Sequence, residues 1–86
     1  MFYVYLLKSM KDDKLYIGFT SNLEKRVKEH NDGKSSSTKS RRPFELIYYE
    51  AYKAKDDAEK REAMLKRFNR AYGGLKRRLH SSLMKL

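Results

Sequence analysis

The sequence predicts an α+β fold in which helices flank a small three-stranded, mainly antiparallel sheet. Three segments rich in aromatic and β-branched residues predict strands at residues 2–9, 14–19 and 44–52. Amphipathic segments after the second and third strands predict helices, so the order of elements is β-β-α-β-α-α. We expect one domain over residues 1–86, with its core at about residues 2–70 and a C-terminal helix at about residues 71–86.

The first two strands should form a hairpin, because only a polar four-residue turn separates them. Such a turn pairs Ser9 with Lys14 and sets Tyr5 opposite Gly18. Alternation then places Tyr16 on the face of Tyr5, one diagonal step away. Since glycine has no side chain, the space over Gly18 is expected to stay open beside the two phenols. The competing interpretation is that tyrosines form strands well and simply pack.

The first helix should begin at a capping box formed by Ser21 and Glu24, and it should end near His30. Leu23, Val27 and His30 share the face that is expected to pack on the sheet. A loop of about a dozen residues follows, and it is Ser-rich, basic and without periodicity. Loops of this length are usually mobile or functional.

The second helix should begin at another capping box, with Asp56 as the cap, and its inner stripe should hold Ala58, Arg61, Leu65 and Phe68. The C-terminal helix is expected to be interrupted, or to start, near Gly73-Gly74. Its leucines recur every four residues, at positions 75, 79 and 83. Packing of these leucines on the core is the favoured interpretation, with contact to a partner protein as the alternative.

The composition excludes several classes of protein. The chain has no cysteine, so disulfide frameworks and thiolate metal sites are ruled out. Its two histidines lack the spacing of known zinc motifs. The longest uncharged apolar run is too short to span a bilayer, and the N-terminus lacks the charged region of a signal peptide, so we expect a cytoplasmic protein without a membrane partner.

Net charge points to the partner. There are 21 Lys and Arg against 11 Asp and Glu, which gives a net charge of +10. A field of this sign attracts polyanions, of which nucleic acid is the commonest.

Two further features could carry chemistry. Arg26 and His30 are neighbours on the first helix, and a guanidinium beside an imidazole suits a phosphate. Glu62 borders the apolar stripe of the second helix, where a carboxylate could hold a hard metal ion. Each feature also has a purely structural interpretation: a solvated Arg with a His at a helix end, and a Glu62–Lys66 surface pair.

Taken in order, these residues resemble the GIY-YIG endonuclease family, in its small stand-alone branch. Tyr3-Val4-Tyr5 and Tyr16-Ile17-Gly18 stand where the two signature tripeptides would be. The pattern continues along the chain through four further segments: residues 19–26, His30-Asn31, Arg42-Pro43 and residues 61–66. The chain is also similar to the N-terminal nuclease module of the bacterial repair excinuclease. Two positions depart from the family: Tyr3 replaces the first glycine, and Asn69 is the only candidate for a later asparagine.

The resemblance implies a metal-dependent endonuclease that hydrolyses DNA phosphodiester bonds, structure-directed and linked to DNA repair or recombination. By position, Glu62 would hold one Mg²⁺ or Mn²⁺ ion. Tyr5 would take a proton from the attacking water, Tyr16 would orient that water or the phosphate, and Arg26 would brace the transition state. His30 would assist proton transfer.

The DNA backbone would be bound mainly from the long basic loop. The residues expected to contact it are Lys34, Lys39, Arg41, Arg42 and Lys66. Two alternatives remain: a module on the same fold that binds DNA or RNA without catalysis, and a role on RNA, since Tyr-rich sheets can stack unpaired bases. The sequence does not identify a protein partner.

Overall fold

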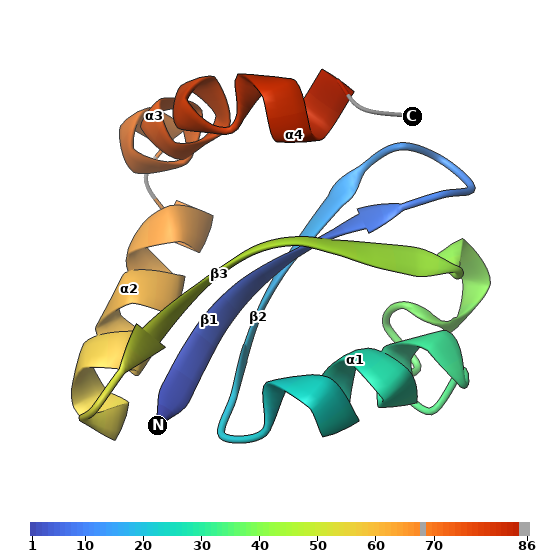
Figure 1. The fold of residues 1–86 in the computed structure, drawn as a ribbon, viewed down its shortest axis with the longest axis horizontal. Coiled ribbons are helices and arrows are strands. Elements are labelled where there is room, and N and C mark those ends of the chain that lie inside the picture. Colours follow the sequence, from blue (N-terminus) through green and yellow to red (C-terminus); the bar gives the residue numbers. More distant parts are fainter. Residues whose placement is uncertain (68, 85–86) are drawn as a thin grey trace.

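The protein has the predicted α+β architecture. The computed structural model describes residues 1–67 and 69–84. Its sheet contains β1 (Phe2–Ser9), β2 (Leu15–Thr20) and β3 (Phe44–Tyr52), all antiparallel in the order β2-β1-β3, so that β1 is central (Figure 1). The helices are α1 (Leu23–Asn31), α2 (Lys55–Arg67), α3 (Asn69–Arg78) and α4 (His80–Met84), with a short 3₁₀ turn at Lys39–Arg41.

The predicted hairpin register is correct. Tyr5 pairs with Gly18 and Leu7 with Tyr16. The Ser9 amide donates to the carbonyl of Lys14 at 2.9 Å, which closes the turn as expected. The sequence could fix this register because the loop length determines which residues face each other.

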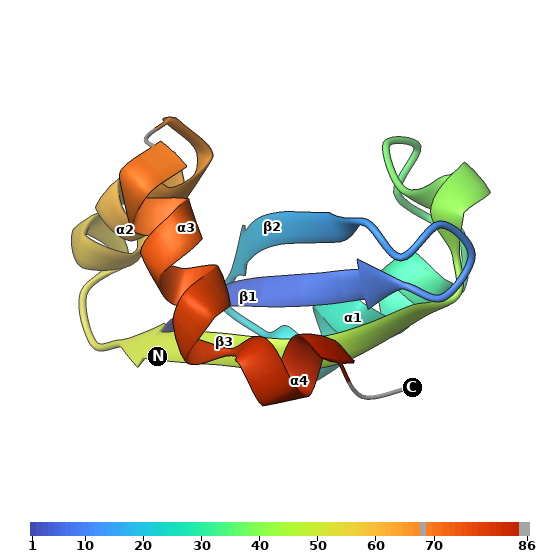
Figure 2. The ribbon, with the colours of Figure 1, turned by 90° about the horizontal axis from the view of Figure 1, so that it is seen from above.

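Each face of the sheet carries its own small core, since side chains alternate along β1. Tyr5 and Leu7 pack with Phe44 under α1, together with the predicted α1 residues Leu23 and Val27. On the opposite face, Val4 packs against residues from α2 and α3, namely Ala58, Leu65 and Leu75. Figures 1 and 2 show α1 on one side of the sheet and α2 to α4 on the other.

A bulge in the pairing of β1 with β3 lets β3 serve both cores. Leu6 pairs with Tyr48 and Leu7 with Leu46, so Ile47 is the extra residue between them. Leu46 therefore packs on the α1 side, whereas Tyr48, also an even-numbered residue, packs on the α2 side. A regular strand would have put both on one face.

Both predicted helix caps are wrong in detail. The cap of α1 is Asn22 and not Ser21, because the Asn22 side chain accepts a hydrogen bond from the Lys25 amide at 3.1 Å. Thr20 holds Asn22 in place by accepting from its amide. The second helix begins at Lys55, so Asp56 lies inside its first turn, where its charge favours the helix dipole.

The C-terminal segment forms two helices instead of one. Gly73 and Gly74 lie inside α3, so the expected interruption there is wrong, and the break comes between Arg78 and His80. Leu75 is buried and Leu79 packs beside it, as expected. The ammonium of Lys8 donates to the carbonyl of Leu83 at 3.0 Å and ties α4 to the sheet. Phe68 and the last two residues of the expected helix lie outside the described residues.

No helix in the described part of the chain is both long and apolar enough to cross a membrane.

Candidate active site

The hydroxyl of Tyr5 lies at the centre of the candidate site. Its ring is 1% exposed and extends from β1 across the neighbouring strand β2. A Cβ atom added at Gly18 would lie 2.2 Å from both Cζ and Oη of Tyr5. The space over Gly18 is therefore filled by the Tyr5 ring itself, and the expectation of an open gap is wrong. Gly18 is needed because any side chain there would displace the phenol.

Tyr16 lies beside this phenol. The two tyrosine ring centroids are 6.5 Å apart, on the same face of the sheet as the register predicts. The half-buried Tyr16 ring also meets the His30 ring edge-on, with 5.1 Å between centroids. Two phenols and one imidazole therefore form a compact aromatic group on the α1 side.

His30 is fully buried and links Tyr5 to the loop after α1. Its Nε2 lies 2.8 Å from the Tyr5 hydroxyl, and its Nδ1 lies 2.7 Å from the hydroxyl of Thr38. The Thr38 hydroxyl donates to the carbonyl of Ser35, so it accepts from Nδ1–H of the imidazole. This order leaves Nε2 with a lone pair that accepts the Tyr5 proton.

Burial lowers the pKa of His30, and the nearby positive charge of Arg26 lowers it further. The imidazole is therefore neutral near pH 7, as the hydrogen bonds require. Thr38 is itself fully buried, and it was missed by sequence reasoning. It sits in a Ser-rich loop without periodicity, so no local pattern distinguishes it from its neighbours.

Arg26 lies one turn before His30 on α1, as its spacing predicts. Its guanidinium pairs with Glu29 at 3.3 Å and stays one-third exposed. Burial raises the pKa of Tyr5 to about 12, against the opposing effect of the Arg26 guanidinium. The phenol is therefore protonated at neutral pH, and it lies close enough to Arg26 to respond to its charge.

Glu62 is the remaining member of the predicted set, and it lies on α2. Its negative charge is the smallest of the influences that raise the pKa of Tyr5, of which burial is the largest. The Glu62 side chain is 24% exposed and pairs with the ammonium of Lys66 at 3.1 Å through Oε2, so the expected surface pair does form. Beside it, a hollow of about 280 Å³ is lined by residues of β2, α2 and α3, including Tyr16, Lys66 and Tyr72.

The chemistry of this donor set is compatible with a hard divalent ion. Within residues 1–67 and 69–84, no three His, Asp or Glu side chains gather into a complete metal cluster. Mg²⁺ commonly binds through one or two carboxylates and keeps several waters, with substrate phosphate supplying further oxygens. The solvent-accessible carboxylate of Glu62 meets that requirement.

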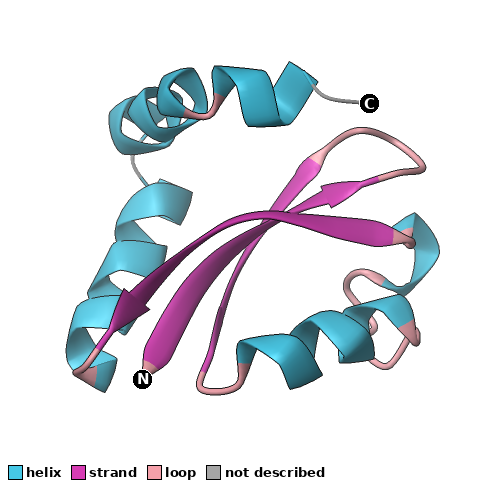
Figure 3. Cartoon of the chain, in the orientation of Figure 1, coloured by secondary structure: helices cyan, strands magenta, loops and turns pink. Residues whose placement is uncertain are grey.

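The four basic residues of the long loop have different environments. Arg41 is engaged within the protein, because its guanidinium donates to Asp12 at 3.1 Å and lies over the Phe44 ring. The Arg42 guanidinium covers Gly33, where an added Cβ would lie 2.1 Å from its Nη1. Lys34 and Lys39 are both exposed. The contact of Thr38 with His30 and the 3₁₀ turn at Lys39–Arg41 fasten the loop beside α1 (Figure 3).

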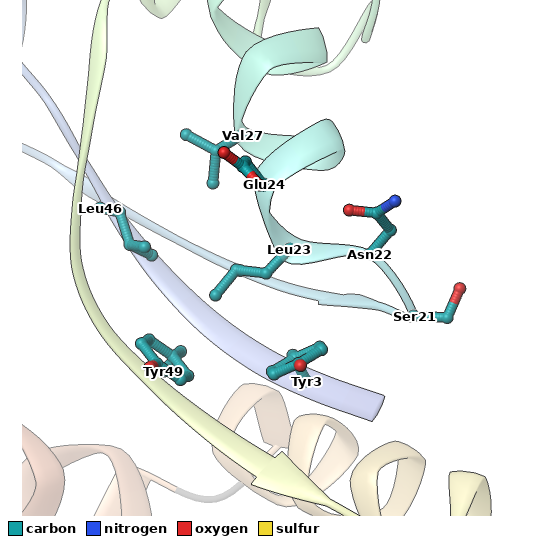
Figure 4. Close-up of a pocket in the computed structure, with 8 residues that line it drawn as sticks. All are labelled: Tyr3, Ser21, Asn22, Leu23, Glu24, Val27, Leu46 and Tyr49. Atoms are coloured by element: carbon teal, nitrogen blue, oxygen red, sulfur yellow. The ribbon is translucent and has the colours of Figure 1, made fainter. Parts of the chain in front are cut away.

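A second hollow on the α1 side has a different character. It encloses about 490 Å³ between the start of α1 and strands β1 and β3, and Tyr3, Leu23 and Tyr49 line it (Figure 4). Its walls are mainly apolar, and Glu24 is its charged lining residue. An acidic rim does not favour a phosphate, so this hollow does not extend the candidate site.

Sequence reasoning also missed the contact that fixes α2. The Glu50 carboxylate on β3 accepts hydrogen bonds from Tyr48, from Tyr52 and from the Arg61 guanidinium, whose Nε lies 2.9 Å away. Burial would raise the pKa of Glu50, but these hydrogen bonds outweigh it and lower the pKa. Since Glu62 follows Arg61, this network also holds the candidate metal ligand in position.

Comparison with known proteins identifies this arrangement. The family model described as the GIY-YIG catalytic domain matches residues 1–77. The chain belongs to the GIY-YIG family. Its two signature tripeptides are neighbours in the sheet, because Tyr5 of the first pairs with Gly18 of the second. Family membership supports a nuclease-type function, with nucleic acid as the class of substrate.

Similar GIY-YIG chains occur in several bacteria. A UPF0213 protein of Clostridium perfringens is 46% identical over 71 residues, which cover 81% of this chain and 75% of the relative. The UPF0213 protein YazA of Bacillus subtilis is 45% identical over 69 residues, covering 79% of this chain and 69% of its own. The solution NMR structure of a UPF0213 protein from Bacillus halodurans is 32% identical, with a TM-score of 0.57 over 100% of this chain and 97% of that one. These names state no activity.

Proposed function

We propose that this GIY-YIG chain is a divalent-metal-dependent endonuclease that hydrolyses phosphodiester bonds in DNA. The supporting observation is the convergence of two phenols, an imidazole, a guanidinium and a carboxylate from four elements. Such groups suit hydrolysis at phosphorus, which needs a positioned nucleophile and charge stabilisation more than covalent chemistry. We further propose that the enzyme recognises DNA structure, as in repair or recombination.

Tyr5 acts as the base in this proposal. Its hydroxyl gives its proton to Nε2 of His30 and takes a proton from the water that attacks phosphorus. The water oxygen forms the new P–O bond, while the bond to the leaving oxygen breaks. A phenol whose pKa is about 12 is a reluctant base at neutral pH, so the neutral imidazole at 2.8 Å is an essential part of the relay.

Arg26 and Tyr16 act on the phosphate. The guanidinium of Arg26, one-third exposed, stabilises the charge that develops on the phosphoryl oxygens. The Tyr16 hydroxyl orients the water or the phosphate. Lys66 lines the adjacent hollow and neutralises the incoming backbone together with Lys34, Lys39, Arg41 and Arg42.

Glu62 would hold one Mg²⁺ or Mn²⁺ ion, which when bound supplies charge neutralisation at the phosphate. Because Glu62 pairs with Lys66, one ammonium must move aside for the cation. We therefore expect weak metal binding without substrate.

A second candidate function is DNA or RNA binding without catalysis. The observation that favours it is the high pKa of Tyr5 beside a single carboxylate, which makes the site a modest catalyst on its own. Cleavage assays separate the two functions, since a binding module keeps its affinity and never cuts.

The test is cleavage of branched, nicked and blunt duplex DNA, and of matched RNA, with Mn²⁺ or Mg²⁺. We expect Glu62→Gln and Arg26→Gln to lower the cleavage rate by at least about 10²-fold, the typical loss when one charge-stabilising group is removed. Glu59→Gln and Lys25→Gln are the matched controls, because they are exposed residues on the same two helices. Wild-type protein that binds DNA and never cuts it would refute the proposed endonuclease activity.

A further inference from the structure

The charge of the chain is divided unevenly along its length. All 11 acidic residues lie within residues 1–62, whereas seven lysines and arginines and no acid follow Glu62. Most of the net charge of +10 therefore resides in the end of α2, in α3 and in the residues beyond. The long loop, by contrast, shares its region with acids that bind its cations, such as Asp12 with Arg41.

Helix α3 presents two of these arginines on its outer face. At 100° per residue, Arg70, Gly73, Gly74 and Arg77 fall on one side of the helix. Leu75, which is 2% exposed, lies on the opposite side and packs in the core. Arg70 and Arg77 are both exposed, and within residues 1–67 and 69–84 no carboxylate pairs with either of them.

The described residues show no steric need for the two glycines between these arginines. Neither has the positive φ that favours glycine, a feature that among the described glycines belongs to Gly33. Among the residues whose side chains are described, an added Cβ at Gly73 or Gly74 would meet the flexible Arg77 side chain alone, at 3.8 and 3.9 Å respectively. Each glycine inside a helix costs about 1 kcal/mol relative to alanine. What glycine provides at such positions is close approach of another backbone.

Helix α3 borders the candidate active site through Tyr72, which lies on the side of the helix that faces away from Arg70 and Arg77. Tyr72 of α3 and Tyr16 of the aromatic group line the same hollow, together with Lys66. The ammonium of Lys76 lies 4.6 Å from the centroid of the Tyr72 ring. Helix α3, which stands next to α2 in Figure 1, is therefore a neighbour of the hollow that Tyr16 lines.

We propose that Arg70, Gly73, Gly74 and Arg77 form a binding surface for the phosphate backbone of duplex DNA. The two guanidiniums bind phosphate oxygens, and the bare helix backbone between them lets the sugar-phosphate chain come close. The identity of the polyanion rests on the proposed function, whereas the location of this surface rests on charge and glycine placement alone. This surface, more than the long loop, supplies the electrostatic affinity.

The first experiment measures DNA binding without cleavage. Anisotropy of a labelled blunt duplex is followed in EDTA as the salt concentration rises, for wild type and for Arg70→Gln/Arg77→Gln. We expect the slope of log K against log salt to flatten by about two units, so that the loss of affinity is about tenfold larger at about 50 mM salt than at about 200 mM. The control is Lys53→Gln/Lys55→Gln, which removes the same charge from exposed residues at and just before the start of α2.

If the arginine variant and the control lose equal affinity for the duplex, then net charge alone determines binding, and the proposed surface on α3 is refuted. Tighter binding to duplex RNA than to DNA would refute the assignment of the ligand. Because EDTA prevents cleavage, these results do not depend on catalysis: a protein that binds through α3 and never cuts refutes the proposed function alone.

The second experiment uses Gly73→Ala/Gly74→Ala. The double variant should melt at a higher temperature than wild type, because alanine favours the helix, yet it should bind the duplex several-fold more weakly. Unchanged binding would overturn the role of the glycines. A lower melting temperature would also overturn it, since it would show that the fold itself requires them.

Discussion

At the scale of single residues, the candidate site depends on Gly18, whose lack of a side chain leaves room for the Tyr5 ring. Tyr5 can reach His30 only because its ring lies flat over Gly18. The family signature thus has a steric reason in this chain: the glycine on β2 provides the room for the tyrosine on β1. The same contact shields the phenol from water and so raises its pKa to about 12.

Replacement of Gly18 by alanine tests this reason. The new Cβ would lie 2.2 Å from the phenol, so the ring must move and the hydrogen bond to His30 must lengthen or break. We expect a loss of about 1–3 kcal/mol in the free energy of unfolding, the usual cost of overpacking a core, together with loss of cleavage. Chemical denaturation measures the first effect. A variant as stable and as active as wild type would show that the ring does not need this position.

The buried imidazole predicts how stability changes with pH. Because burial lowers the pKa of His30 below its ordinary value of 6.5, the unfolded chain binds a proton at a higher pH than the folded one. Stability contributed by the neutral imidazole is therefore complete above about pH 6.5 and is lost as the pH falls through the folded pKa.

Thermal melts between neutral and mildly acidic pH should show this loss. His80→Gln is the suitable background, since it leaves one imidazole to titrate and His80 is exposed. In that variant, NMR of the His30 ring should report protonation only below about pH 6.5, the ordinary value for an imidazole. Protonation of the ring above that value would contradict the assigned hydrogen-bond order.

At the scale of elements, the position of α2 depends on a polar contact inside an otherwise apolar interface. Glu50 on β3 is shared by two tyrosine hydroxyls and the Arg61 guanidinium, and its side chain is 13% exposed. Removing one partner of a buried ion pair costs more than the pair itself contributes, because a desolvated charge remains.

Arg61→Ala should therefore lower the free energy of unfolding by about 3 kcal/mol. Its neighbour Lys60 is exposed and serves as the control, with an expected change within about 0.5 kcal/mol for Lys60→Ala. Because Glu62 follows Arg61, the Arg61 variant should also lose cleavage under conditions in which it is still folded. Equal stability of the two variants would mean that α2 is held by its apolar side chains alone.

The elements also show which features a sequence can predict. Strand positions and the hairpin register followed from alternation and loop length, and Leu23, Val27 and His30 followed from helical spacing. The bulge at Ile47 could not be predicted, because it depends on how β3 meets both helical layers. The cap of α1 was misassigned by one position, since Ser21 and Asn22 are both good caps and only backbone geometry decides between them.

The same limit applies to the site. The proximity of Tyr5 to Tyr16 followed from the sequence because both positions are set by local pairing. The contact of Thr38 with His30 did not, because it joins a loop to a buried helix face through tertiary packing. Gly73 and Gly74 were wrongly predicted to break the helix, because a pattern-based prediction considers only how far glycine destabilises a helix.

At the scale of the whole molecule, the separation of charge has a kinetic consequence. All the acidic residues precede residue 63, so the excess of positive charge is concentrated in the C-terminal part of the chain. In the field of a polyanion such a molecule is expected to turn before contact, so that collisions begin with α3 facing the target. Productive encounters then outnumber those of a randomly tumbling sphere, and added electrolyte slows capture more than it hastens escape.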